Sequence, residues 1–178
     1  MPERALFQGK IVAKFGDDIN TDYIIPAYLL QEAWGKKYFA EHAFERYDPS
    51  FVSRCRANAS KDSIVVAGKN FGCGSSREQA VYAIQYNDVS AVVAESFPDI
   101  FYRNCISNGF PALRVESTKD LEIGDSLLID LQSLSVKNER SNAELRIYMT
   151  FEERATLLSG GRLGKVKERL RERLLATS

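Results

Sequence analysis

The sequence is short of the residues that build most acid–base sites and metal centres. Its 178 residues include one histidine, His42, and three cysteines, Cys55, Cys73 and Cys105. An odd number of thiols cannot all pair in disulfides, and reduced cysteines are typical of proteins that are not exported. We therefore expect three free thiols. If the chain is an enzyme, it has few of the usual catalytic side chains.

Net charge, long apolar runs and an export signal are also missing. The 24 basic and 24 acidic residues cancel, which argues against nucleic acid or an anionic membrane as the partner, because both attract a basic excess. No apolar run approaches the ~20 residues that span a bilayer. The first residues lack the basic and apolar regions of a signal peptide. A composition of 44% hydrophobic and 27% charged residues is that of a soluble globular protein, and we expect a cytoplasmic location.

Apolar segments alternate with helical ones in the first two thirds of the chain. Continuously apolar strands that alternate with helices predict a parallel sheet covered on both faces. Cys55 lies in a stretch that we interpret as a charged loop. Strands are expected at residues 9–15, 63–67 and 89–94, helices at residues 77–86 and 98–108, and a helix or helical loop at residues 31–47.

The last third has a different pattern. Three short apolar segments, at residues 127–131, 134–136 and 145–148, predict an antiparallel meander. Thr150 and Glu153 form a capping-box pattern at the start of a short helix, and a charged helix is expected over residues 163–175. We predict one α/β domain over residues 1–178, with a parallel central sheet, helices, a smaller antiparallel sheet, and a helical tail at about 150–178.

The turn Gly-Cys-Gly-Ser-Ser-Arg-Glu, residues 72–78, carries the clearest chemical signal. Its glycines let the backbone approach a ligand closely. Ser75 and Glu78 have the spacing of a second capping box, and a helix N-terminus attracts anions. Arg77 adds a planar cation suited to a carboxylate. The turn predicts a small-anion site; the alternative is a tight turn whose serines only cap a helix.

Other interpretations of the short motifs are weaker. Arg77 occupies the third-glycine position of a dinucleotide fingerprint, and the Gly-Lys-Ser/Thr of a phosphate-binding loop is absent. A Cys73 nucleophile would need a base, and His42 lies among aromatic residues, where a structural role is favoured. The Gly-Asp-Ser-Leu stretch at 124–127 matches an esterase motif but has no histidine after it, so we interpret it as a turn.

Three segments together resemble a known family. They are Gly-Asp-Asp-Ile-Asn-Thr-Asp-Tyr-Ile-Ile-Pro at 16–26, Asn-Phe-Gly-Cys-Gly-Ser-Ser-Arg-Glu-Gln-Ala at 70–80, and Ala-Glu-Ser-Phe with Ile-Phe-Tyr-Arg-Asn at 94–104. In type and order they resemble the motifs of the small subunits of 3-isopropylmalate dehydratase and homoaconitase, equivalent to the swivelling domain of aconitase. The similarity covers roughly residues 9–130, and the short chain resembles the archaeal type.

This resemblance implies a swivelling β/β/α domain and a hydro-lyase that isomerises hydroxy acids by dehydration and rehydration. A [4Fe-4S] cluster on a separate large subunit would act as the Lewis acid, and the small subunit would close over it. Ser75 would remove the carbon-bound proton. The other expected site residues are Ser76, Arg77 and Arg103, which would contact the substrate, and Asp22 with Thr21, which would support proton transfer or orient a partner.

The cluster itself does not suit this chain. Fe–S ligation needs three or four convergent thiolates, and the three cysteines share no Cys-x-x-Cys spacing. Pro98-Asp99 also departs from the Ala-Arg of many relatives, which removes a positive charge near the third segment and leaves Arg103 for any anion contact there. We expect no metal on this chain and a cluster-bearing large subunit as its partner.

Substrate choice is expected to depend on the residues after the first motif. Leu30 stands near the position where homoaconitase-like members have an arginine for a distal carboxylate. Leu30 offers only apolar contact, and an extra carboxylate would be costly to bury unpaired. This favours isopropylmalate, with homoaconitase, citraconate or methylmalate, and dimethylmaleate hydratase activities as alternatives. Alternatively, Leu30 is a core residue.

Two non-enzymatic hypotheses remain open. The chain could be an anion- or nucleotide-binding module, which would bind its ligand without a large subunit. It could also be a regulatory aconitase-like domain that binds RNA, but the zero net charge argues against this.

Overall fold

In the described part of the chain, all strands belong to one seven-stranded mixed sheet. The computed structural model describes residues 5–30, 35–59 and 62–176. The sheet order is β4-β3-β2-β1-β5-β6-β7. Its strands are β1 (Leu6–Phe15), β2 (Ser63–Ala67), β3 (Val89–Ala94), β4 (Ala112–Arg114), β5 (Ser126–Asp130), β6 (Ser135–Asn138) and β7 (Glu144–Arg146).

Strand β1 joins the two halves of the sheet. It pairs in parallel with β2 and antiparallel with β5, and its register with β2 shifts between Ile11 and Ala13. The mixed α/β class and the antiparallel meander are therefore confirmed. The meander continues the parallel strands through β1 and does not form a second sheet.

The helices expected at residues 77–86, 98–108 and 163–175 are present, with bounds within two residues of those predicted. The helices of the described chain are α1 (Thr21–Ile24), a 3-10 turn η1 (Ala27–Leu30), α2 (Lys36–Glu41), α3 (Phe51–Ala57), α4 (Glu78–Gln85), α5 (Asp99–Ser107), α6 (Phe151–Leu158) and α7 (Gly161–Ala176). Residues 31–34 of the helix or helical loop expected over 31–47 lie outside the described residues. The rest of that segment ends its helix at His42, and Phe44 takes a positive φ of 56°.

The expectation of a charged loop around Cys55 was wrong. Residues 51–57 form α3, in which Phe51 and Cys55 lie four residues apart and are both buried. This spacing places them on one face of a helix. The basic residues that suggested a loop, Arg54 and Arg56, lie in the last turn of α3.

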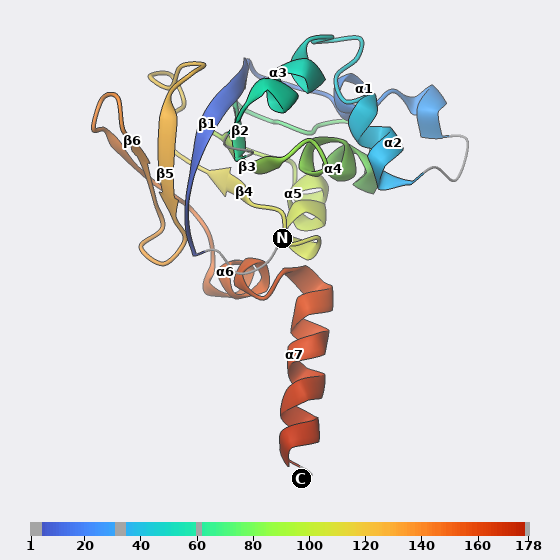
Figure 1. Ribbon diagram of the computed structural model, residues 1–178, viewed down its shortest axis with the longest axis vertical. Helices are drawn as coiled ribbons and strands as arrows, with labels where there is room; N and C mark the ends of the chain where they lie inside the picture. The colour runs from blue at the N-terminus through green and yellow to red at the C-terminus, as the bar shows by residue number, and fades with distance from the viewer. Residues whose placement is uncertain (1–4, 31–34, 60–61, 177–178) are drawn as a thin grey trace.

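Different elements cover the two faces of the sheet. Strands β2, β3 and β4 are neighbours in chain order, so the right-handed crossovers through α4 and α5 place both helices on the same face. Figure 1 shows α1–α5 gathered on that side. The other face has its own core, which contains residues of β1–β4 and of the curled strands β5–β7. The helix-free face is thus closed by the sheet itself.

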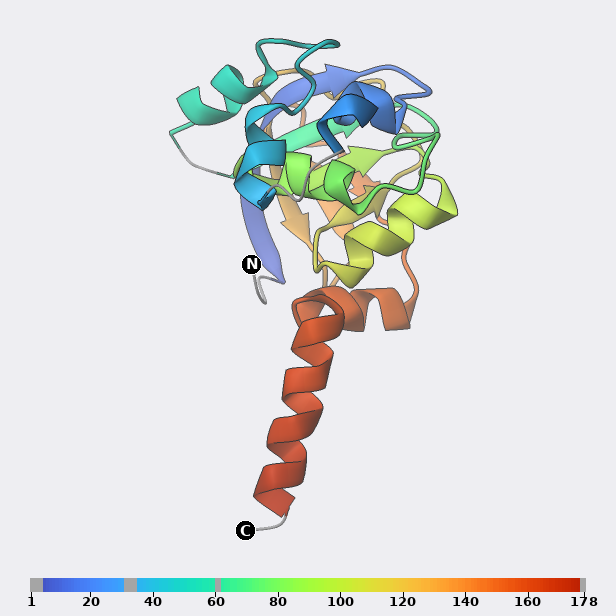
Figure 2. The same ribbon diagram turned by 90° about the vertical axis from the view of Figure 1, so that its right-hand side faces the viewer.

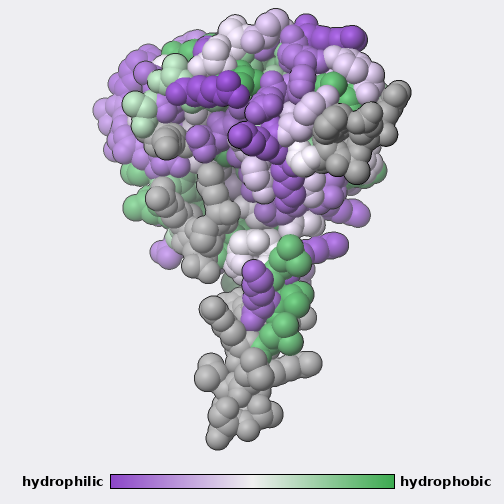
Figure 3. All heavy atoms as spheres, turned by 45° about the vertical axis from the view of Figure 1, so that its right-hand side comes forward, coloured by the Kyte–Doolittle hydropathy of each residue, from purple (hydrophilic) through white to green (hydrophobic). Residues whose placement is uncertain are grey.

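The C-terminal helix α7 extends away from the rest of the molecule (Figures 1 and 2). The expected capping box at Thr150 and Glu153 is present and begins α6. Gly161, at a φ of 85°, begins α7. Apolar side chains of α7 face solvent, coloured green on the lower part of Figure 3; they include Leu163, Val166 and Leu170. Among the described helices, none has the length and apolar character needed to cross a membrane.

Candidate active site

The three motif segments meet at one edge of the sheet. They follow β1, β2 and β3, which are adjacent parallel strands. The carboxyl ends of parallel strands lie at the same edge, where α/β proteins commonly bind ligands. The Phe71 amide donates to the Ser96 carbonyl, and Phe71 packs edge-on against Phe97. Segments that are far apart in the sequence are therefore side by side here.

Main-chain hydrogen bonds join the first segment to the second. Asn20 and Cys73 form a parallel β-bridge, and the Thr21 amide donates to the Cys73 carbonyl over 2.7 Å. The Gly72 amide donates to the Ile19 carbonyl over 2.8 Å. These contacts fix Gly72 and Cys73 against the start of α1.

Two glycines make this close approach possible. Gly72 and Gly74 have φ angles of 85° and 93°, which residues other than glycine rarely adopt. A Cβ at Gly72 would lie 2.3 Å from the Phe101 ring, and one at Gly74 would lie 2.6 Å from the Asn20 side chain. Asn20 was not among the site residues predicted from the sequence. It also caps α1 by accepting a hydrogen bond from the Asp22 amide, and the Asn-x-Asp spacing was the signal for this cap.

Thr21 holds the main chain of Ser75. Its hydroxyl donates to the Ser75 carbonyl over 3.2 Å and accepts from the Ser75 amide over 3.1 Å. Thr21 is completely buried. Thr21 therefore lies near the site, as expected, and supports the main chain of Ser75. Its hydroxyl makes both of these hydrogen bonds to Ser75.

Ser75, Ser76 and Arg77 present their polar groups together. Both serines are exposed, whereas the Arg77 side chain is mostly buried. The Arg77 guanidinium pairs with the Asp22 carboxylate and donates to the Ser75 hydroxyl over 3.3 Å. It also donates to the Ile25 carbonyl over 3.3 Å. A fixed positive charge thus contacts the Ser75 oxygen.

The capping box predicted from Ser75 and Glu78 is not formed. Helix α4 begins at Glu78, and its N-cap is Arg77, which is extended and makes no side-chain cap bond. The Glu78 carboxylate instead accepts from the Asn108 side chain over 2.8 Å. Ser75 therefore lies before the helix, because Thr21 holds its main chain. The positive group that contacts the Ser75 oxygen is the Arg77 guanidinium.

The Asp22–Arg77 pair predicts a measurable titration. The hydrogen bond from Arg77, opposed by partial desolvation, lowers the pKa of Asp22. A lowered folded-state pKa stabilises the fold above the unfolded pKa of about 3.9, and this stabilisation disappears as the pH falls through the lower folded value. Carboxyl titration by NMR should therefore place the pKa of Asp22 below about 3.9, and Arg77→Gln should raise it. An unchanged titration in that variant would contradict the pairing.

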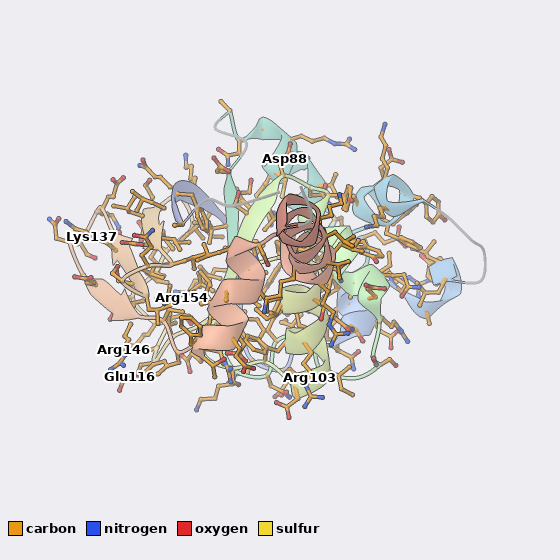
Figure 4. The ribbon with its side chains drawn as sticks, turned by 90° about the horizontal axis from the view of Figure 1, so that it is seen from below. Asp88, Arg103, Glu116, Lys137, Arg146 and Arg154 are labelled. Carbon is orange, nitrogen blue, oxygen red and sulfur yellow. The ribbon has the colours of Figure 1, made fainter. Side chains whose placement is uncertain are left out.

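The structure does not bring Arg103 to this turn. Phe101, two residues earlier on α5, contacts Gly72. Two residues correspond to about 200° of rotation around a helix, so Arg103 points to the opposite side. Figure 4 shows Arg103 at the outer surface of α5. Leu30 lies at the end of η1, partly buried and packed on the core, which leaves part of its apolar surface available.

Within the part of the chain that the structure describes, the cysteines and His42 show no catalytic arrangement. Burial raises the pKa of Cys55 to about 12 and also raises the pKa of Cys73 and Cys105. His42 caps the end of α2 and contacts the Glu45 carboxylate over 2.6 Å. Asp125, in the esterase-like stretch, is buried, and the Arg140 guanidinium, opposed by partial desolvation, lowers its pKa. Their contacts support structural roles for His42 and Asp125.

The sequence model of the aconitase C-terminal domain family matches residues 10–118. The chain belongs to this family. A curated family member from Metallosphaera sedula, named 3-isopropylmalate dehydratase small subunit, is 48% identical over 123 residues, 68% of this chain and 73% of its own. A protein of the same name from Saccharolobus solfataricus is 46% identical over 129 residues, 72% and 74% of the two chains.

A solved structure extends the similarity over nearly the whole aconitase-family chain. The crystal structure of 3-isopropylmalate dehydratase from Methanocaldococcus jannaschii superimposes with a TM-score of 0.85 at 35% identity. It covers 96% of this chain and 99% of that one. The family resemblance and the fold class predicted from sequence are thus confirmed.

Proposed function

We propose that the chain is the small subunit of a 3-isopropylmalate dehydratase, a hydro-lyase that interconverts 2- and 3-isopropylmalate. One observation carries the proposal: an exposed Ser75 is held by Thr21 and receives a hydrogen bond from Arg77. The curated relatives, which match more than two thirds of this chain, are named 3-isopropylmalate dehydratase small subunit. Leucine biosynthesis follows from that activity.

In the proposed reaction, the Ser75 oxygen takes the carbon-bound proton of the substrate. A serine acts as a base only where its alkoxide is stabilised, and a preorganised cation provides this in a site closed to water. Arg77 is such a cation, because Asp22 and the Ile25 carbonyl already fix its orientation. Ser76 would hydrogen-bond the substrate, and Arg77 would bind a substrate carboxylate.

The iron–sulfur cluster that the family implies does not fit this chain. Within the described residues, no three histidine, cysteine, aspartate or glutamate side chains are grouped to hold a metal. Cys55 and Cys105 are buried on separate helices. We therefore assign the cluster to a large subunit that covers the exposed Ser75. The free thiols suit a cytoplasmic location.

Substrate selection is assigned to Leu30. Its partly exposed apolar side chain follows the first motif and suits an isopropyl branch, whereas a distal carboxylate would lack a partner. Related hydratases that act on homocitrate or methyl-branched malates are the second candidates. Arg103 is left out of the substrate contacts, because it points away from Gly72.

The decisive experiment is assembly followed by assay. We expect the chain to co-purify with a cluster-bearing large subunit and the complex to interconvert 2- and 3-isopropylmalate, while the chain alone is inactive. Activity of the chain alone would overturn the assignment of the cluster to a partner. A complex that prefers homocitrate or citrate would overturn the role of Leu30. Tight nucleotide binding without a large subunit, or salt-sensitive RNA binding, would favour a non-enzymatic function.

A further inference from the structure

We propose that a second site, on the side of α5 away from Gly72, binds a small oxyanion such as phosphate or a carboxylate. A hollow of about 400 Å³ lies between α5, α6 and α7. This basic hollow is lined by Arg103 of α5, Glu152 of α6, and Arg162 and Lys165 of α7, among others. Its volume is within the range of small-molecule sites.

Within the described residues, the three cations of the basic hollow form no ion pair. Some other arginines pair with carboxylates, as Arg54 does with Asp48 and Arg140 does with Asp125. In contrast, no ion pair or side-chain hydrogen bond of Arg103, Arg162 or Lys165 is present among the described residues. Three unpaired cations around one hollow repel each other, and a bound anion would relieve that repulsion.

One residue that lines the basic hollow, Tyr102, has a buried polar group without a partner in the described part of the chain. Tyr102 is about 5% exposed, and its hydroxyl has no hydrogen-bond partner among the described residues. Among the described residues, Nε of Arg114 also has no hydrogen-bond partner, and the Arg114 guanidinium lies 4.2 Å from the centre of the Tyr102 ring. Buried polar groups are normally satisfied by the protein, water or a ligand. Tyr102 thus places an unsatisfied hydroxyl next to the cations of the hollow.

Two carboxylates also line the basic hollow, but only one is free. Glu153 pairs with Arg114 over 3.6 Å and accepts a hydrogen bond from the Thr150 amide over 2.8 Å. Glu152 has no such partner among the described residues. Three cations against one free carboxylate leave a positive excess, so the hollow suits an anion. Glu152 should weaken anion binding by like-charge repulsion.

This proposal does not depend on the hydro-lyase function. The turn that carries Ser75 and the basic hollow lie on different sides of α5, because Phe101 faces Gly72 whereas Arg103 lines the hollow. Figure 4 shows Arg103 on α5 and Arg154 on the neighbouring α6, while Lys137 lies on the far side of the molecule. Lys137 is exposed and provides a control of equal charge.

The test is an NMR titration of the full-length chain at low salt. Inorganic phosphate and malonate are added separately, and the side-chain N–H signals of Arg103 and Arg162 are followed. We expect both signals to shift. The probe that binds more tightly, phosphate or malonate, shows whether the natural anion is a phosphate or a carboxylate. Arg103→Gln and Lys165→Gln should each weaken binding about five-fold, the upper range for an exposed ion pair. Added NaCl should weaken it further.

Two variants separate a built site from general charge attraction. Glu152→Gln should tighten anion binding, because it removes the free carboxylate, whereas Lys137→Gln should leave it unchanged. The proposal is overturned if neither anion shifts the Arg103 and Arg162 signals, or if Lys137→Gln weakens binding as much as Lys165→Gln. It is also overturned if these variants weaken only assembly with a large subunit, since an acidic side chain of the partner would then be the occupant.

Discussion

Ser75→Ala is expected to reduce turnover of the assembled enzyme by about 10²- to 10⁴-fold, the usual contribution of a general acid or base. The substitution removes the oxygen that receives the Arg77 hydrogen bond. Ser75 is exposed and Thr21 contacts only its main chain, so the alanine variant should fold normally. The measurement is kcat for isopropylmalate isomerisation with excess large subunit.

Ser76→Ala is the matched control for this substitution. It removes the neighbouring exposed hydroxyl, which is proposed to contact substrate without accepting the proton. We expect a smaller loss, seen mainly in KM, because a group that binds ground state and transition state equally affects KM. Equal kcat losses in the two variants, or a near-normal rate for Ser75→Ala, would remove Ser75 from the base role.

Gly72→Ala is expected to lower the free energy of unfolding by about 2–5 kcal/mol, from left-handed backbone strain and overpacking together. Gly72 has a φ of 85°, and an added Cβ would lie 2.3 Å from the ring of Phe101. Phe101 is buried and packs edge-on against Phe71, so it has little room to move. Denaturant unfolding of the purified chain measures the loss.

Gly124→Ala separates strain from overpacking. Gly124 has a comparable φ of 96°, but a Cβ there meets no atom within 4 Å. Only the backbone strain should remain, so we expect a loss of about 1–2 kcal/mol. Equal destabilisation by the two variants would show that the Phe101 contact contributes nothing.

The sequence predicted the strongly patterned strands and helices but missed short elements, including strand β4. The strands at residues 63–67 and 89–94 are confirmed at the predicted positions, because continuously apolar segments of this length are buried on both faces. The described part of the helix or helical loop expected over 31–47 is the short helix α2 followed by turns, whereas α3 was missed. Its seven residues form a short helix that packs Phe51 and Cys55 into the core, and such tertiary contacts outweigh local composition.

The candidate site was predictable in part. The motif turn, with Ser75 and Arg77, stood out from its glycines and polar residues, and Asp22 does meet Arg77. Nothing local indicated that the Thr21 hydroxyl would hold the main chain of Ser75, 54 residues away. The placement of Arg103 on the outer side of α5 follows from its helical phase relative to Phe101, which packs against Gly72.

The sequence alone determined the residue types that the site requires, the apolar strands that support it, and the family to which the chain belongs. The tertiary structure decided which of these residues meet. Pairing of β1 with β2 brings the first two motifs together, and Thr21 keeps Ser75 outside helix α4. Both effects come from long-range hydrogen bonds and packing, which a local pattern of residues does not specify.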